Sequence, residues 1–432
     1  MPNIITDKIK LRNAIRFKNL VNLNQNSSLY FYLGRPNPWS NDNEPPIPGD
    51  NPQEDAKIWD EILGLKKLLP SDIKHVVKRV DWKYDTVYDQ YDDEDEELFN
   101  KVFYVMNSTY DVYKCISNNR RSKSLVEPSG KSLNIFTSSD GYRWKYLYSI
   151  SAADQLKFLT RNWMPVDVNA DVSAFAKDGG IEHIIINNGG IDYSSFSKVR
   201  IDGDGKNANI GVRTRLGVIQ DFAFNNSGTQ YRNANAYIFD PTGSGYSSNI
   251  RAIINPVGGH GFDPISELNA HTLMFNTKTD YNEGFEDFPP EVKFRRLGII
   301  DTPEDAYGNP ANALTLNGLY SIQFDNVTGI FVKDEYILAN NSLSNLYCVT
   351  ANVISSNAII KYIQSIDSTR NFNTPNIGEL MVGLTSGATG IVKTLRTPEV
   401  LHDTGSIIYV ENRTPVTRSV DQSEILHLVI EF

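Results

Sequence analysis

The chain closes with the stretch G-S-I-I-Y-V-E-N-R-T-P-V-T-R-S-V-D-Q-S-E-I-L-H-L-V-I-E-F, residues 405–432. Its two apolar runs are rich in β-branched and aromatic residues, which suit the pleated surface of a β-strand. Pro415 cannot donate a hydrogen bond to a neighbouring strand, so we place it in the connection between the runs or on a sheet edge. Because chain ends fray unless something holds them, an apolar terminus predicts a final strand, 425–432, within a sheet.

The composition is that of a globular protein. The 432 residues carry a net charge of −10, with 22% charged and 40% hydrophobic residues, enough apolar material for a core. The length predicts two or three domains. Phosphate binding needs clustered Lys and Arg, so the acidic balance argues against a nucleic-acid-binding protein. No apolar run approaches about 18 residues, and we expect no membrane span.

The two cysteines indicate a reducing compartment. Cys115 and Cys348 are far apart in a long chain, which is not the pattern of a disulfide scaffold. We expect two free, buried thiols. Residues 1–10 lack the apolar core of a signal peptide, so we expect the protein to be assembled in a cytoplasm.

Residues 51–69 carry the clearest helix signal. Asn51 is a favourable N-cap, Pro52 fits the first helical position, and Glu54 stands where the acid of a capping box would. Apolar residues then recur at helical spacing: Ile58, Ile62, Leu65 and Leu69. We predict one helix over 51–69. Before it, we expect a strand and a short helix within 1–28 and a short strand at 29–33.

The sequence D-G-Y-R-W-K-Y-L-Y, residues 140–148, predicts an aromatic strand. Tyr142, Trp144, Tyr146 and Tyr148 alternate with basic or aliphatic residues, and a period of two places all four aromatic rings on one sheet face. Such a face could bind sugar rings. Since aromatic side chains dominate burial energetics, we favour the interpretation that it forms part of the core.

We predict a mainly β protein. Its body would be a multi-layer β-sandwich with helix-bearing loops, a discontinuous domain made of residues 1–165, 266–311 and 396–432. Residues 166–265 are rich in Gly, Asn, Ser and Asp with short apolar runs, which is typical of strands joined by many turns. Residues 312–395 alternate apolar runs with turns in the same way, and we expect an inserted small β-barrel-like module there.

Three segments carry residue types that could form a chemical site. D-G-D-G-K-N, residues 202–207, begins like a calcium loop but then loses the ligand spacing, so a tight turn is favoured. The acidic run 92–97 is interpreted as a solvated loop, since like charges repel. G-G-H-G-F-D-P, residues 258–264, is expected to be an ordered turn with a hydrogen-bonded His260, because His271 does not complete a metal-ligand spacing.

The sequence therefore offers no catalytic, cofactor-binding or metal-binding residue, and we expect the protein not to be an enzyme. It contains no nucleophile-elbow, P-loop or dinucleotide-binding motif. Its many acidic residues are compatible with a glycoside hydrolase, which uses two separated carboxylates, although nothing in the sequence singles out such a pair.

A series of short motifs resembles those of one family, the baseplate wedge proteins encoded by gene eight of T-even-type contractile-tailed phages. In chain order they are G-R-P-N-P-W-S (34–40), L-L-P-S-D-I (68–73) with K-R-V-D-W (78–82), D-G-Y-R-W-K-Y-L-Y (140–148), F-R-R-L-G-I-I (294–300), and I-Y-V-E-N-R-T-P-V (408–416) with D-Q-S-E-I (421–425). Each motif alone is weak, but their order is that of the family from one end of the chain to the other. Residues near 170–265 and 312–395 have no evident counterpart in the T-even member and read as expansions.

The resemblance implies a structural virion protein with a β-sandwich body. It would lie in the tail baseplate, form a homodimer within each wedge, bind other wedge proteins and help relay the trigger for sheath contraction. The family offers no catalytic residue to transfer to this chain. Two alternatives stay open at this point. One is a receptor-binding tail protein that recognises host surface glycan, suggested by the Tyr and Asn richness and by the aromatic strand at 142–148, and the other is a tail-associated glycan hydrolase.

Overall fold

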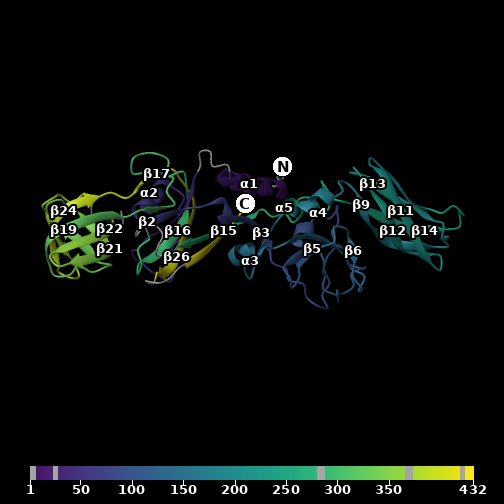
Figure 1. The fold of residues 1–432 in the computed structure, drawn as a ribbon, viewed down its shortest axis with the longest axis horizontal. Coiled ribbons are helices and arrows are strands. Elements are labelled where there is room, and N and C mark those ends of the chain that lie inside the picture. Colours follow the sequence, from purple (N-terminus) through teal and green to yellow (C-terminus); the bar gives the residue numbers. More distant parts are fainter. Residues whose placement is uncertain (1–5, 23–27, 280–287, 365–372, 419–423) are drawn as a thin grey trace. The chain divides into compact units, whose positions relative to one another are not determined.

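The computed structural model describes residues 6–22, 28–279, 288–364, 373–418 and 424–432. The chain divides into two compact units. The first unit takes in residues 1–15, 74–274 and 429–432, and the second takes in residues 16–73 and 275–428. Figure 1 labels their elements along the chain.

A five-stranded antiparallel sheet forms the centre of the second unit. Its strands, in spatial order, are β18 (Thr315–Asn317), β2 (Ile62–Lys67), β1 (Leu29–Gly34), β16 (Lys293–Asp301) and β26 (Ser406–Thr417). Every residue of β1 is buried, as expected of a central strand covered on both faces. A short ladder of β17 (Glu304–Asp305) and β25 (Val400–Leu401) belongs to the same unit. The strand expected at 29–33 is confirmed.

The helix predicted over 51–69 is wrong beyond its first half. Helix α2 (Pro52–Asp60) begins as predicted, because the Asn51 side chain accepts hydrogen bonds from the backbone N–H groups of Gln53 and Glu54. The chain then enters β2, and a 3₁₀ turn (Pro70–Asp72) follows. Since the first four residues of β2 are buried on both faces, its apolar run fits a helical spacing as well as a strand.

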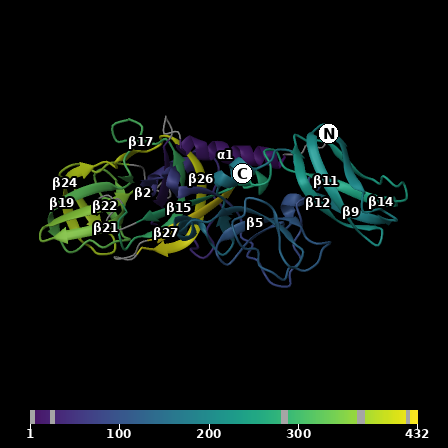
Figure 2. The same cartoon turned by 45° about the vertical axis from the view of Figure 1, so that its right-hand side comes forward.

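The second unit also contains a closed six-stranded barrel (Figures 1 and 2). Its strands, in order around the barrel, are β19 (Tyr320–Thr328), β22 (Asn357–Ile363), β21 (Asn345–Ile354), β20 (Tyr336–Ala339), β23 (Leu380–Gly383) and β24 (Thr389–Arg396). Inward-facing residues such as Ile322, Phe324, Ile337 and Ile360 fill it. Closure leaves the barrel without a free sheet edge.

In the first unit, the aromatic stretch lies on β7 (Arg143–Ser149). The sheet order is β4 (Tyr104–Met106), β5 (Asp111–Ser117), β7 and β6 (Phe136–Thr137). Tyr142, Trp144, Tyr146 and Tyr148 are all at most 2% exposed, so the core interpretation is confirmed.

The expectation that all four rings share one sheet face is wrong for Tyr148. Val112 of β5 pairs with Tyr148 while Tyr113 pairs with Tyr146, so Leu147 is the extra residue of a β-bulge. The bulge reverses the alternation. Tyr148 therefore packs with Val112 in a different apolar cluster from Tyr146.

Two further sheets of the first unit share one apolar core. One has the order β12 (Val218–Thr229), β11 (Lys206–Arg215), β10 (Lys198–Gly203) and β13 (Ala234–Phe239), and the other pairs β14 (Tyr246–Ile254) with β9 (Ile181–Ile191). Side chains from all six strands contribute to the core, among them Ile184, Ile201, Ile210, Phe222, Ile238 and Ala252. The β structure expected in residues 166–265 is thus a small sandwich.

The helical elements are short except for one. Helix α1 (Asp7–Asn22) has 16 residues, longer than the short helix expected, and the strand expected before it falls on residues outside the described range. The others are α3 (Ala152–Phe158), α4 (Ala170–Phe175), α5 (Pro264–Glu267) and a 3₁₀ turn (Leu98–Asn100). Within the described residues, no helix combines the length and apolar character that crossing a membrane requires.

The C-terminal stretch forms two strands, as predicted. The first, β26, runs on to Thr417, so Glu411–Arg413 is part of a strand rather than a connection, and Pro415 lies on the edge strand of its sheet. The second, β27 (Glu424–Glu431), is the edge of a four-stranded sheet ordered β27, β15 (Thr272–Thr279), β3 (Ile73–Lys78) and β8 (Trp163–Pro165). Residues 421–423 of the D-Q-S-E-I motif lie outside the described residues.

The mainly β fold class is confirmed, with several antiparallel sheets and a small six-stranded barrel. Both cysteines are free and buried, as expected. The domain boundaries given above stay predictions.

Candidate functional site

Two of the family-like motifs meet on one buried carboxylate in the second unit. Arg35 donates from Nη1 to Oε1 of Glu61 at 2.6 Å, and Arg296 donates from Nη1 to Oε2 at 3.1 Å. Glu61 is fully buried, and both arginines are at most 6% exposed. A buried charge is tolerated only when it is paired and hydrogen-bonded. Each charge in this arginine–glutamate junction therefore needs the others.

Trp39, from the first of these motifs, covers the junction. Its ring centroid lies 3.8 Å from the guanidinium carbon of Arg35 and 5.4 Å from that of Arg296, which is cation–π geometry. The loop that carries Trp39 is held by a second pair, in which Arg295 donates to both oxygens of Asp42 at 2.8 and 2.7 Å. This pairing lowers the pKa of Asp42, with the hydrogen bond from Arg295 as the largest cause.

The C-terminal motif closes the same junction. Asn412 accepts a hydrogen bond from Nε of Arg296 at 2.9 Å and donates to the Pro46 carbonyl at 2.9 Å. The indole Nε1 of Trp39 donates to the Arg413 carbonyl at 3.0 Å. The three motifs thus tie the proline-rich loop to the edge strand β26, and every charged group is occupied. This arrangement is suited to holding segments together and offers no free acid, base or nucleophile.

In the first unit, Asp140 organises two further motifs. Its Oδ2 accepts hydrogen bonds from the backbone N–H groups of Leu125 at 2.8 Å and Val126 at 3.0 Å, and from the Ser124 hydroxyl at 3.2 Å. The indole of Trp82, from K-R-V-D-W, donates to the same hydroxyl at 3.0 Å. Burial raises the pKa of Asp140, but the hydrogen bonds outweigh it and hold that pKa below its usual value. This is again a structural role.

A buried ion pair contacts the glycine-rich segment 258–264. Lys114, which is fully buried, donates from Nζ to Oε2 of Glu267 at 2.8 Å, and Gly261 N–H donates to Oε1 at 2.6 Å. The expected turn is present, but the expected hydrogen bond of His260 is not confirmed for Nδ1. That atom lies 3.9 Å from Glu267 Oε2 and has no hydrogen-bond partner among the described residues. Burial, with the nearby Lys114 charge, lowers the pKa of His260 to about 4.

The remaining candidate segments also have clear roles. Residues 202–207 form the tight turn between β10 and β11, as predicted. His271 is separate from His260 and contacts the Asn269 carbonyl and Glu431. Among the described residues, no group of three or more His, Cys, Asp or Glu side chains could hold a metal ion.

The acidic run 92–97 is more than the solvated loop that we expected. Arg251 of β14 forms ion pairs with Asp92, with Asp93 at 3.5 Å and with Glu94 at 3.2 Å. The side chains of Asp92 and Asp93 are only 22% and 20% exposed. Like charges do repel, but one guanidinium placed by a distant strand compensates them. This interaction holds the acidic loop against β14 within the first unit.

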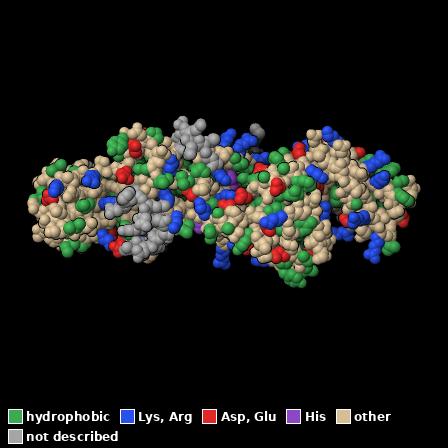
Figure 3. Space-filling view, viewed as in Figure 1, with side chains coloured by type: hydrophobic (Ala, Val, Ile, Leu, Met, Phe, Trp, Pro, Cys, Tyr) green, Lys and Arg blue, Asp and Glu red, His purple; other side chains and the backbone are tan. Residues whose placement is uncertain are grey.

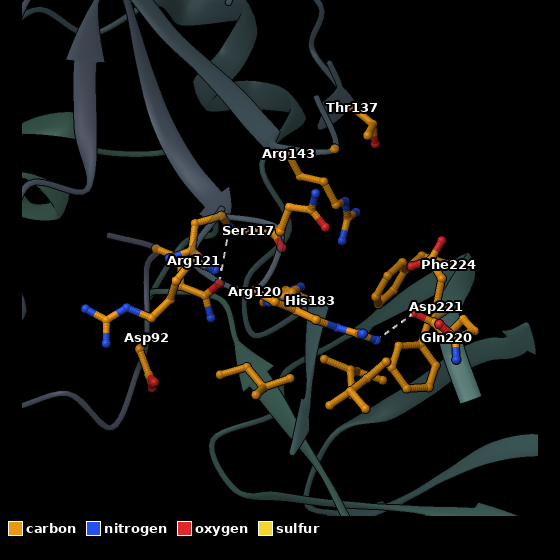
Figure 4. A pocket seen from close by; sticks show the side chains of 18 of the residues that line it. Asp92, Ser117, Arg120, Arg121, Thr137, Arg143, His183, Gln220, Asp221 and Phe224 are labelled. Atoms are coloured by element: carbon orange, nitrogen blue, oxygen red, sulfur yellow. Dashed lines mark hydrogen bonds between the residues drawn. The ribbon is translucent and has the colours of Figure 1, made fainter. Parts of the chain in front are cut away.

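Next to this contact, the first unit has a polar groove of about 1000 Å³. Its lining includes Arg120, Arg121 and Arg143 from the β5 and β7 side, and His183 and Phe224 from β9 and β12 (Figure 4). Sequence reasoning did not identify this groove, since residues 120–121 carried only the signal of a polar, basic loop. On the face shown in Figure 3, Lys and Arg side chains are spread among acidic and neutral ones.

Comparisons with known proteins agree with the motif series. Residues 3–118 match a family model described as Phage-Gp8, Bacteriophage T4, Gp8. The chain is also 24% identical over 204 residues to the baseplate wedge protein gp8 of Enterobacteria phage T4. The matched region covers 38% of this chain and 60% of that relative. The chain thus spans about three fifths of the length of the relative that it matches.

The resemblance to the gene eight product family is therefore confirmed. The expected class, a structural protein of the phage tail, and the expected location, the tail baseplate, agree with both comparisons.

Proposed function

We propose that the chain is a wedge subunit that bridges neighbouring subunits of a phage tail baseplate and helps relay the trigger for sheath contraction. In this role it forms a homodimer and binds other wedge proteins. It performs no catalysis: it acts by presenting rigid surfaces to its neighbours.

The arginine–glutamate junction is the observation that best supports a structural role. Four residues that the sequence shares with the wedge family are all engaged in contacts that hold a proline-rich loop: Arg35, Trp39, Arg295 and Asn412. An enzyme would instead leave a polar group free to reach a substrate. A loop held this firmly can transmit force and keep its shape when a partner binds.

The glycan-binding alternative loses one of the features that suggested it, the aromatic strand. An aromatic sugar platform must be exposed, whereas Tyr142, Trp144, Tyr146 and Tyr148 are buried in two apolar clusters. We therefore do not retain receptor binding through this strand as a second function.

Co-expression tests the proposal. The tagged chain is produced together with candidate wedge proteins from the same phage, and the captured complex is weighed by native mass spectrometry. We expect a complex with two copies of this chain and at least one wedge neighbour. A matched variant, Glu61→Gln, should capture less partner if the proline-rich loop contributes to the interface. A monomer that captures no wedge protein would contradict the proposal.

A further inference from the structure

The groove of the first unit has walls that are fixed relative to each other. Arg251 of β14 binds the acidic loop at Asp92–Glu94 on one side. On the other side, Arg143 of β7 donates to the Glu182 carbonyl of β9 at 2.9 Å. The groove is therefore a formed feature of this unit, and a preorganised site loses less entropy on binding.

Three guanidinium groups in the groove lack an acidic partner. Among the described residues, no carboxylate lies within ion-pair distance of Arg120, Arg121 or Arg143. Arg120 donates only to the Gln220 carbonyl, at 3.4 Å, and Arg143 stacks over Phe224 with 4.8 Å to the ring centroid. The Arg121 side chain has neither a hydrogen bond nor an ion pair to the described residues. Figure 4 shows the three groups spread along the groove rather than gathered at one point.

Four acids line the groove: three of them pair with cations, and the fourth, Asp89, accepts a hydrogen bond from the Val102 backbone N–H at 3.3 Å. Asp92 pairs with Arg251, Asp95 pairs with Lys101 at 2.5 Å, and Asp221 pairs with Arg213 at 3.5 Å. The groove therefore presents an excess of unpaired positive charge, although the chain as a whole has a net charge of −10.

His183 supplies an independent indication of a ligand. It lies on β9, is 9% exposed, and lines the groove. Its ring has no hydrogen bond to any described residue, so its nitrogens can pair with a ligand in the groove. Burial, reinforced by the Arg143 and Arg251 charges, lowers its pKa to about 3. The neutral ring can accept one hydrogen bond and donate another.

The two exposed arginines are placed by an unusual backbone. Asn119, Arg120 and Arg121 have φ of 49°, 58° and 60°, three successive residues in the left-handed region. Such a conformation is unfavourable for arginine and persists only where the surrounding structure holds it. Here the Asn118 side chain accepts from the Arg121 backbone N–H at 3.0 Å.

We propose that this groove binds an extended acidic peptide segment of a neighbouring protein subunit, with its carboxylates on Arg120, Arg121 and Arg143. Guanidinium groups match carboxylates in shape and charge, and their spacing along the groove suits acids that recur along an extended chain. Ile185, Ile186 and Phe224 also line the groove, are only partly buried, and can contact the apolar side chains between those acids. These apolar contacts favour a peptide over a polyphosphate or an acidic polysaccharide.

The inference rests on the proposed function only for the source of the segment, a neighbouring subunit. Its test therefore uses the isolated full chain. Fluorescence anisotropy measures the binding of a labelled peptide that alternates Glu with Leu. Arg120→Asn and Arg121→Asn remove charge while keeping a residue that tolerates the left-handed conformation. Arg161→Asn, at an exposed arginine of the same unit that does not line the groove, is the matched control.

We expect Arg120→Asn and Arg121→Asn each to weaken peptide binding about tenfold, which corresponds to about 1.4 kcal/mol. Arg161→Asn should leave the affinity unchanged, and added salt should weaken binding to the wild-type chain. His183→Phe, which keeps a ring but removes its polar atoms, should also weaken binding. Circular dichroism confirms that each variant is folded.

Three results would overturn the inference: no peptide binding, equal binding by all variants, or binding of inorganic polyphosphate or a polyuronic acid in place of the peptide. If the peptide binds as expected while wedge proteins are not captured in co-expression, the proposed function fails and the groove assignment stands.

Discussion

Replacing Glu61 with Gln removes the negative charge that lies between Arg35 and Arg296 in the second unit. Gln is close in size, so the packing changes little and the effect reports the charge. Glu61 accepts two charge-assisted hydrogen bonds, each worth about 1.5–3 kcal/mol. The substitution removes the counter-charge that Glu61 supplies to two buried guanidinium groups, and breaking a buried pair in this way costs about 3–5 kcal/mol.

Hydrogen exchange followed by mass spectrometry measures this loss locally, which suits a chain with two compact units. Strands β1 and β16, which carry or adjoin the arginines, should exchange about 10²- to 10⁴-fold faster in Glu61→Gln. Strands β5 and β7 of the first unit serve as an internal reference. Glu54→Gln is the control: its partner Lys57 is 2.9 Å away and both side chains are partly exposed, so the cost is at most about 0.5 kcal/mol. A change below about tenfold in β1 and β16 would refute the reasoning.

Gly298→Ala should separate β26 from β16, because a Cβ atom there would lie 2.1 Å from the Tyr409 carbonyl oxygen. Thermal unfolding should show that the free energy of unfolding falls by about 1–3 kcal/mol or more. Gly211→Ala is the control and should be tolerated, because the nearest atom to its added Cβ would be 3.6 Å away. Lowering the pH from 6.5 to 4 should destabilise the first unit, since the unfolded chain binds a proton at His260 that the folded one, with a pKa of about 4, does not. The free energy of unfolding should fall by about 1.4 kcal/mol per pH unit through this group, and this pH dependence should be weaker in His260→Gln. The same pH dependence in the variant would contradict the assignment to His260. Deleting residues 425–432 should prevent folding because it removes most of β27, and a soluble product with cooperative unfolding would contradict this.

Local sequence signals predicted the elements whose causes are local. The N-cap at Asn51 and the first helical position at Pro52 depend on neighbouring residues, and both are present in α2. The aromatic strand at 143–149 follows from a period of two, and its burial follows from the size of its rings. The turn at 202–207 follows from its glycines and from the failure of the calcium-loop spacing.

Features set by distant partners were not predictable in the same way. Residues 62–67 form a strand because β1 and β18 pair with them on either side, which no local pattern encodes. Tyr148 changes face because of a single bulged residue in the pairing of β5 with β7. The charge of Asp92 and Asp93 is compensated by Arg251, which is about 160 residues away in the chain.

The candidate sites show the same limit. The motifs around Arg35 and Arg296 could be quoted from the sequence, but their convergence on Glu61 depends on a contact between residues 235 positions apart. The groove around Arg120, Arg121 and His183 depends on β9 and β12 lying against the β5 and β7 sheet. Neither site has a spacing within one element that could have identified it.

The most direct test of the structural role is electron microscopy of phage particles that carry a tag on this chain. We expect the label on the tail baseplate, at positions that repeat around the tail axis. Label on the fibre tips or on the capsid, with none on the baseplate, would contradict the assignment of this chain as a baseplate wedge subunit.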